Sequence, residues 1–240
     1  MTGPTRPLPV IEIFGPTIQG EGALIGHPTM FIRFGGCDYR CSWCDTMYAV
    51  DPAEVARNST YMTSEEIVER LHQVAGGTLP EWVTLSGGNP VIHNLSDLLK
   101  LTSKEGLYIN LETQGSFWRD WVTEVDLVTV SPKPPSSGMA SKLDRHVLDR
   151  YMELPQSVLK IVIMGQADLD FAKEISRAYP MKRLFLQVGN PDPNGTEDKR
   201  SMLLTKLRWL VDTTLKDPEM KRAVILPQLH VLIWGNKRGV

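Results

Sequence analysis

The sequence predicts an α/β fold whose mostly parallel sheet forms a full or partial (β/α) barrel or an open sheet. Three observations lead to this prediction: short β-branched runs recur along the chain, amphipathic stretches separate several of them, and polar motifs follow the ends of the runs. A helical connection of ten or more residues returns the next strand parallel to the last, through a right-handed crossover. At 240 residues the chain suits one such domain, which we expect to span residues 1–240.

The individual strands and helices are predicted from the spacing of apolar residues and from the turn and capping residues between them. Strands are expected at residues 10–14, 30–34, 82–86, 108–112, 127–131, 159–164, 184–188 and 224–227. Helices are expected at 64–74, 95–104, 142–152, 169–178 and 202–215, where apolar residues recur at helical spacing. The first helix also has a start signal, because Thr63 and Glu66 have the spacing of a capping box ahead of an apolar stripe.

The composition argues against two broad classes of function. The 26 basic and 28 acidic residues are spread along the chain without a block of like charge, so broad electrostatic binding to nucleic acid is not indicated. No apolar run approaches the roughly 20 residues that span a bilayer, and the N-terminus lacks a basic segment followed by an apolar one. We therefore expect a soluble, cytoplasmic protein with no membrane or nucleic-acid partner.

All three cysteines of the chain, Cys37, Cys41 and Cys44, lie within eight residues in the spacing C-x3-C-x2-C. Three thiols cannot all pair, and neighbours this close would form strained disulfide loops, so a disulfide framework is improbable. Soft sulfur ligands select iron–sulfur clusters, zinc or copper(I). In a [4Fe–4S] cluster three cysteines would leave one iron without a protein ligand, free to chelate the amino and carboxylate groups of a small molecule.

Two other interpretations of the thiols remain open. A zinc site could take its fourth ligand from His27, Asp38, Asp45 or a remote histidine, although the spacing is unlike the paired C-x2-C of common zinc modules. The thiols could also be free core cysteines, but these usually scatter along a chain. The cluster interpretation is favoured over both.

Six polar segments follow predicted strands and are expected to meet. They are residues 35–46, 86–90, 112–115, 131–133, 187–190 and 227–230. In parallel α/β folds the carboxyl ends of the strands share one face, which is where barrels and open sheets place ligands. These segments therefore predict one site.

The cysteine segment, with Trp43 before its last cysteine, resembles the signature of the radical S-adenosylmethionine (SAM) enzymes. The downstream Gly87-Gly88-Asn89-Pro90 resembles the GGEP-type segment of that superfamily, whose acidic side chain receives the methionyl amino group. An amide at Asn89 can still accept that hydrogen bond, without the full negative charge. The resemblance implies a modified, incomplete (β/α) TIM-like barrel with a cluster-binding loop at residues 35–46.

A narrower resemblance extends almost end to end, to the 7-carboxy-7-deazaguanine synthase (QueE) family. It rests on FGPTIQGEG at 14–22, MFIR at 30–33, CDT at 44–46, ETQG at 112–115, SPKPP at 131–135 and WGNKRGV at 234–240. The resemblance implies that SAM is cleaved reductively to a 5′-deoxyadenosyl radical, which takes hydrogen from C6 of 6-carboxy-5,6,7,8-tetrahydropterin. The ring then contracts and loses ammonia, giving 7-carboxy-7-deazaguanine for queuosine and related deazapurines.

The same resemblance implies roles for individual residues. The cluster would take Cys37, Cys41 and Cys44, and Thr46 would bind Mg²⁺. SAM would contact Trp43, Cys44, Asp45, Gly88, Ser131, Pro132 and Lys133, with residues 187–190 as a further segment. The pterin would contact Ile18, Gln19, Gly20, Arg33, Ser86 and the C-terminal Val240, with Glu21 as a further partner. Arg33 suits the substrate carboxylate because a guanidinium can bind two oxygens, and Gly88 suits a close approach of backbone to ligand.

The resemblance also implies partners, namely a flavodoxin or ferredoxin as reductant and a second copy of the chain in a homodimer. Rival functions are another radical SAM enzyme, such as an activase that makes a glycyl radical on a protein, and a non-catalytic iron–sulfur electron carrier or zinc module. A small buried pocket would favour the pterin enzyme, whereas an open groove would favour the activase.

Overall fold

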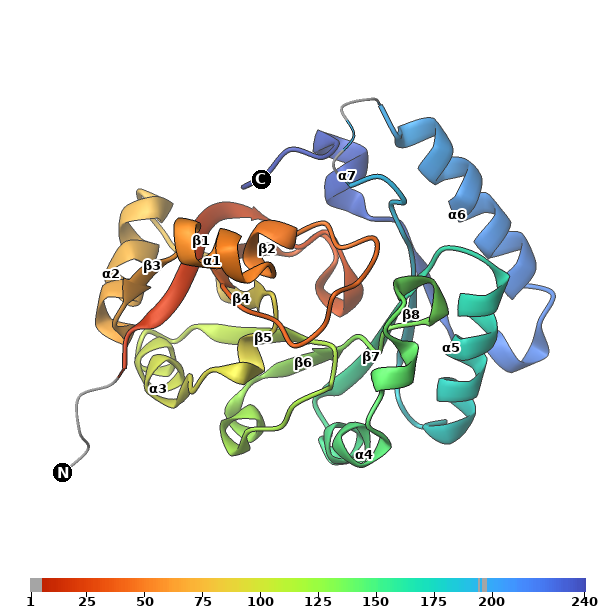
Figure 1. Cartoon of the computed structure of the whole chain (residues 1–240), viewed down its shortest axis with the longest axis horizontal. Helices are drawn as coiled ribbons and strands as arrows, with labels where there is room; N and C mark the ends of the chain where they lie inside the picture. The colour runs from red at the N-terminus through yellow and green to blue at the C-terminus, as the bar shows by residue number, and fades with distance from the viewer. Residues whose placement is uncertain (1–5, 194, 196–197) are drawn as a thin grey trace.

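The computed structural model describes residues 6–193, 195 and 198–240. Over these residues one nine-stranded sheet runs in the order β3-β1-β2-β4-β5-β6-β7-β8-β9 (Figure 1). Its strands are β1 (Leu8–Ile18), β2 (Pro28–Phe34), β3 (Thr60–Met62), β4 (Trp82–Gly87), β5 (Tyr108–Thr113), β6 (Leu127–Val130), β7 (Ser157–Ile163), β8 (Leu184–Val188) and β9 (Val224–Leu226). All eight predicted strands are present.

The pairing is parallel from β2 through β9 but antiparallel at one edge. Strand β1 runs antiparallel to both β2 and β3, whereas β2 pairs parallel with β4 and each later strand with the next. Only residues 19–27 connect β1 to β2. A parallel return needs a crossover of a dozen or more residues, so this connection allows only the antiparallel arrangement.

The five predicted helices are present, with two short ones in addition. They are α1 (Pro52–Asn58), α2 (Ser64–Ala75), α3 (Ser96–Lys104), α4 (Arg145–Glu153), α5 (Gln166–Ala178), α6 (Arg200–Thr214) and α7 (Leu229–Trp234). The predicted capping box forms in α2, since the Thr63 side chain accepts from the Glu66 N–H and the Glu66 side chain accepts from the Thr63 N–H. Helix α4 begins three residues later than predicted because the Asp144 side chain caps it.

The sheet does not close into a barrel, and this leaves its concave side accessible. Helices α2 to α6 lie along the outer side of the curved sheet, while α7 and the C-terminal segment return to the first strands (Figure 1). Apolar residues of the strands and helices form the buried core between these layers. Among the described residues, no helix is long and apolar enough to cross a membrane. This open, incomplete barrel agrees with the fold class that the sequence predicts.

Candidate active site

A pocket lies at the carboxyl ends of the strands, and all six polar segments contribute to it. It is lined by the three cysteines and by every predicted site residue except Pro132. These residues are Ile18, Gln19, Gly20, Glu21, Arg33, Trp43, Asp45, Thr46, Ser86, Gly88, Ser131, Lys133 and Val240. The expectation that the parallel strands bring these segments to one face is therefore confirmed.

The three thiols lie on one irregular loop whose backbone is fixed on both sides. Gly36 N–H donates to the Ala49 carbonyl at 2.8 Å, and Ser42 N–H donates to the Ser137 carbonyl at 3.0 Å. The cysteines are partly buried and none forms a disulfide. Burial raises the pKa of the Cys41 thiol to about 11, and the pKa values of the other two thiols are raised for the same reason. A metal that binds here must displace protons.

The loop after β6 packs against the cysteine loop. The Trp43 indole N–H donates to Ser136 Oγ at 3.0 Å, and Lys133 Nζ lies 5.9 Å from the centre of the Trp43 ring. Lys133 also donates to Ser131 Oγ at 3.3 Å. The described residues contain no group of three or more His, Cys, Asp or Glu side chains placed to hold a single metal ion. Lys133, Trp43 and the hydroxyls of Ser131 and Ser136 place a cation, an aromatic ring and two polar groups beside the cysteine loop.

Asn89 does not line the pocket, in contrast to the expectation from the GGEP-type segment. It is fully buried, its Nδ2 donates to Asp38 at 3.0 Å, and its Oδ1 accepts from Thr113 Oγ1 at 3.0 Å. A glutamate here would direct a second carboxylate at Asp38, whereas an amide offers a donor and an acceptor. Asn89 therefore stabilises the cysteine loop through its hydrogen bond to Asp38.

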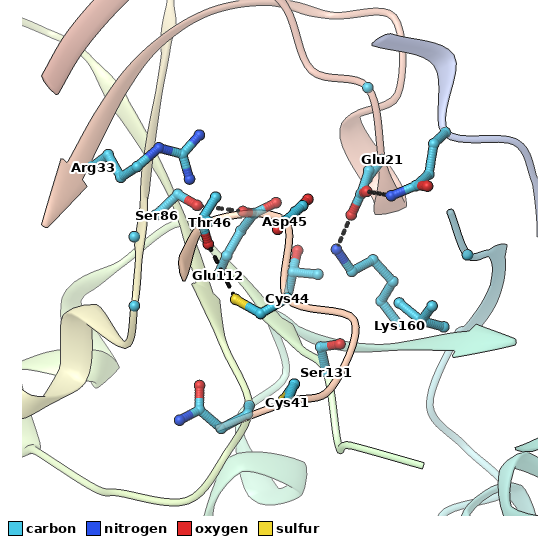
Figure 2. Close-up of a pocket in the computed structure, with 18 of the residues that line it drawn as sticks. Glu21, Arg33, Cys41, Cys44, Asp45, Thr46, Ser86, Glu112, Ser131 and Lys160 are labelled. Atoms are coloured by element: carbon cyan, nitrogen blue, oxygen red, sulfur yellow. Dashed lines mark hydrogen bonds and ion pairs between the residues drawn. The ribbon is translucent and has the colours of Figure 1, made fainter. Parts of the chain in front are cut away.

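A second group of polar residues in the pocket lining converges on Glu112, which Figure 2 shows close to Thr46 and Ser86. Gln19 Nε2 donates to one carboxylate oxygen of Glu112 at 3.2 Å, and Ser86 Oγ donates to the other at 2.9 Å. Sequence reasoning included Glu112 in a motif but assigned it no role. Its position at the end of β5 was the available signal.

Glu21 forms a buried ion pair with Lys160, a residue of β7 that sequence reasoning missed (Figure 2). Gln228 Nε2 donates to the other carboxylate oxygen of Glu21 at 2.8 Å. Burial alone would raise the pKa of Glu21, but the charge of Lys160, with His230 and the hydrogen bonds, lowers it to about 2. Glu21 is therefore an ionised acceptor at the wall of the pocket.

Gly20 and His230 explain how the first and last parts of the chain meet beside this pair. The Gly20 carbonyl accepts from the Leu229 N–H at 3.0 Å, and a Cβ on Gly20 would lie 2.2 Å from Nδ1 of His230. Only glycine allows this approach. The predicted substrate segment is therefore held by α7.

Arg33 extends from β2 and its guanidinium group faces the cavity (Figure 2). Its Nε donates to Glu12 at 2.7 Å, while the two terminal guanidinium nitrogens have no hydrogen-bond partner among the described residues. Burial would lower the pKa of Arg33, but Tyr48, Glu12 and Asp45 raise it, so the guanidinium stays charged. It can accept an anionic ligand.

We expect Gly88→Ala to displace the cysteine loop. A Cβ at this position would lie 2.0 Å from the Gly36 carbonyl oxygen, so the glycine permits close packing of two protein segments as well as access to the pocket. Overpacking of this kind costs about 1–3 kcal/mol in unfolding free energy. Chemical denaturation checks the loss of stability, and Gly77→Ala, where a Cβ meets nothing within 4 Å, is the matched control. Equal stability of the two variants would contradict the packing role.

Comparison with known proteins gives consistent relatives. No family model matches the chain. It is 45% identical to the 7-carboxy-7-deazaguanine synthase of Bacillus subtilis (strain 168), over 97% of this chain and 98% of that protein. It is 43% identical to the protein of the same name from Bacillus cereus, over 97% and 99% of the two chains.

Two solved structures share the fold. QueE from Escherichia coli matches with a TM-score of 0.69 at 24% identity, covering 93% of this chain and 94% of that one. Streptococcus suis SuiB, in a complex with its precursor peptide SuiA, matches with a TM-score of 0.57 at 12% identity, covering 82% and 48%.

Proposed function

Because this chain belongs to the 7-carboxy-7-deazaguanine synthase family, we propose that it is a radical SAM enzyme that converts 6-carboxy-5,6,7,8-tetrahydropterin to 7-carboxy-7-deazaguanine with loss of ammonia. The observation that carries the proposal is that one pocket is lined both by the three cysteines and by Gln19, Glu112 and Arg33. A cofactor that generates a radical and a polar substrate need this proximity.

Cys37, Cys41 and Cys44 would hold a [4Fe–4S] cluster. Their donor chemistry fits, since three unpaired thiols on one loop face a common cavity and soft sulfur favours iron–sulfur clusters. When bound, a cluster with one iron free of protein ligands supplies the site for SAM and the electron for its reductive cleavage. The protein contributes three thiols in the lining of the pocket that Ser131 and Lys133 also line.

The residues around the thiols fit SAM and a divalent cation. Trp43 offers a ring face, Lys133 a positive charge and Ser131 a hydroxyl, and all three line the pocket beside the cysteines. Asp45 and Gly88 also line it, whereas Pro132 does not. Thr46 would give Mg²⁺ one hard oxygen ligand, with waters and substrate supplying the others. Its Oγ1 lies 3.6 Å from Cys44 Sγ, so the cation would sit near the cofactor.

A second set of residues in the same pocket fits the pterin. Glu112 and Glu21 present carboxylate oxygens that can accept from ring N–H groups, and Gln19 supplies an amide that can act both ways. Arg33 would bind the substrate carboxylate with its two terminal nitrogens. Because Gln19, Ser86 and Lys160 are buried, little water competes for these contacts.

The proposal is tested by incubating anaerobically reconstituted, reduced protein with SAM, Mg²⁺ and the carboxy-tetrahydropterin. Mass spectrometry should detect 7-carboxy-7-deazaguanine and an equivalent of ammonia. SAM cleavage without conversion would favour a different radical substrate, such as the protein that an activase modifies. Iron and sulfide absent after reconstitution, with zinc present, would favour the zinc module.

Two partners belong to the same proposal. A flavodoxin or ferredoxin would reduce the cluster, and the chain would act as a homodimer in the cytoplasm. Sedimentation velocity tests the dimer, and replacing the chemical reductant with either purified electron carrier tests the reductant.

A further inference from the structure

One carboxylate, that of Glu12, joins three segments that are far apart in sequence. Glu12 on β1 and Arg33 on β2 are cross-strand partners, and Arg33 Nε donates to Glu12 Oε1 at 2.7 Å. The Tyr48 hydroxyl donates to the same oxygen at 3.0 Å. Arg238, in the C-terminal segment, donates from Nε to Glu12 Oε2 at 2.8 Å.

The contacts form one cluster at the rim of the pocket, in which Glu12 and Arg33 are largely buried and Arg238 is half-exposed. The Arg238 guanidinium carbon lies 3.7 Å from the centre of the Tyr48 ring, and that of Arg33 lies 6.0 Å from the same ring. The Glu12 side chain is only 16% exposed and that of Arg33 13%. Glu12 accepts three hydrogen bonds, two of them charge-assisted bonds from arginine Nε atoms, so the Arg33 side chain is held in one orientation.

Each member of the cluster leads to a different part of the site. The terminal nitrogens of Arg33 face the cavity. Tyr48 lies two residues after Thr46, at the end of the cysteine loop. Arg238 lies two residues before Val240, which lines the pocket. Two guanidinium groups share the Glu12 carboxylate, so these three side chains together carry a net positive charge, which Asp45 near Arg33 offsets in part. Glu12 itself does not line the main pocket.

We propose that Glu12 is a positioning residue that holds Arg33 ready for the substrate carboxylate and at the same time fastens residues 238–240 to the pocket rim. It acts through these two arginines and does not touch the substrate. The inference rests on the proposed function for the identity of the carboxylate ligand, whereas the fastening of the C-terminal segment does not depend on it.

The test compares Glu12→Gln with the wild-type holoenzyme. Calorimetry on the unreduced protein with SAM bound should give a Kd for the carboxy-tetrahydropterin raised roughly 10- to 100-fold, the effect of weakening a hydrogen bond between charged groups. The Kd for tetrahydropterin, which lacks the carboxylate, should be unchanged. Trypsin should release residues 239–240 several-fold faster, as followed by intact mass.

Two further variants separate the two roles and guard against misfolding. Arg238→Ala keeps the pair of Glu12 with Arg33, so it should speed trypsin cleavage after Lys237 but raise the Kd less than Glu12→Gln does. Glu219→Gln, which breaks an exposed ion pair with Arg177 outside the pocket, is the matched control and should change neither quantity.

The outcomes distinguish this inference from the proposed function. Equal loss of affinity for the two pterins in a folded Glu12→Gln protein would overturn the proposal that Glu12 positions Arg33. Unchanged trypsin cleavage in both Glu12→Gln and Arg238→Ala would overturn the proposal that Glu12 fastens residues 238–240. If the wild-type protein binds neither pterin, the proposed function fails, while the cleavage experiment still decides the structural half. If Glu12→Gln does not fold, unchanged cleavage in Arg238→Ala alone overturns the inference.

Discussion

Replacing Cys41 with alanine is expected to abolish formation of the deazaguanine and SAM cleavage together. A [4Fe–4S] cluster held by three cysteines has no spare protein ligand among them, so losing one removes the means of holding it. The iron and sulfide content after anaerobic reconstitution should fall to background. Metal analysis, electron paramagnetic resonance and mass spectrometry of both reactions measure the effect.

The fold itself should survive this change, because the Cys41 thiol is unpaired and only partly buried. Far-ultraviolet circular dichroism should match wild type. Ser42→Ala is the control in the same loop, since among the described residues its exposed hydroxyl donates a hydrogen bond only to the Ser136 carbonyl. A Cys41→Ala protein that keeps full iron content and turnover would refute the assignment of the three thiols to a cluster.

Lys160→Met is expected to cost about 3–5 kcal/mol of unfolding free energy at neutral pH, the usual result of leaving a buried charge without its partner. The side chains of Lys160 and Glu21 are 8% and 14% exposed, so water compensates little for the lost ammonium. Chemical denaturation followed by tryptophan fluorescence measures the change. Lys100→Met, which breaks an exposed pair with Asp97, should stay within about 0.5 kcal/mol of wild type.

The deficit of Lys160→Met should shrink as the pH falls. In wild type the pKa of Glu21 lies at about 2, below its ordinary 4.5, so the pair stabilises the protein above pH 4.5 and this contribution is lost between 4.5 and 2. In the variant, the effect of burial dominates and raises the pKa of Glu21. Acid therefore protonates the unpaired carboxylate and removes the cost of burying its charge. The double variant Glu21→Gln/Lys160→Met should recover part of the stability. A deficit that stays constant from pH 7 to 4 would exclude the ion pair as its cause.

The sequence could predict those parts of the fold that depend on local pattern. The helix at Ser64–Ala75 carried both a capping box and an apolar stripe, and both are present. Helix α1 was missed because none of its residues is buried, so no stripe marks it. Strand β3 has three residues, too few to show a period of two.

The candidate site was predictable where polar residues end a strand, and less so elsewhere. Lys160 lies inside β7, all of whose residues are buried. Nothing in the neighbouring sequence indicates that this lysine is buried in an ion pair. The partner that explains it, Glu21, is brought near only by the tertiary fold. Asn89 was expected to meet the cofactor, but the nearby Asp38 carboxylate takes its amide, a neighbour that spacing cannot reveal.

The contacts of β1 and the loop after it with residues 228–238 have a consequence for how the molecule is made. Gly20, Glu21 and Glu12 take their partners from Leu229, Gln228 and Arg238, more than 200 residues later. A ribosome adding 5–20 residues per second delivers those partners about 10 to 40 s after the first strand. During that interval Gly20, Glu21 and Glu12 lack these partners, so this part of the pocket cannot be complete before residues 228–238 have been synthesised.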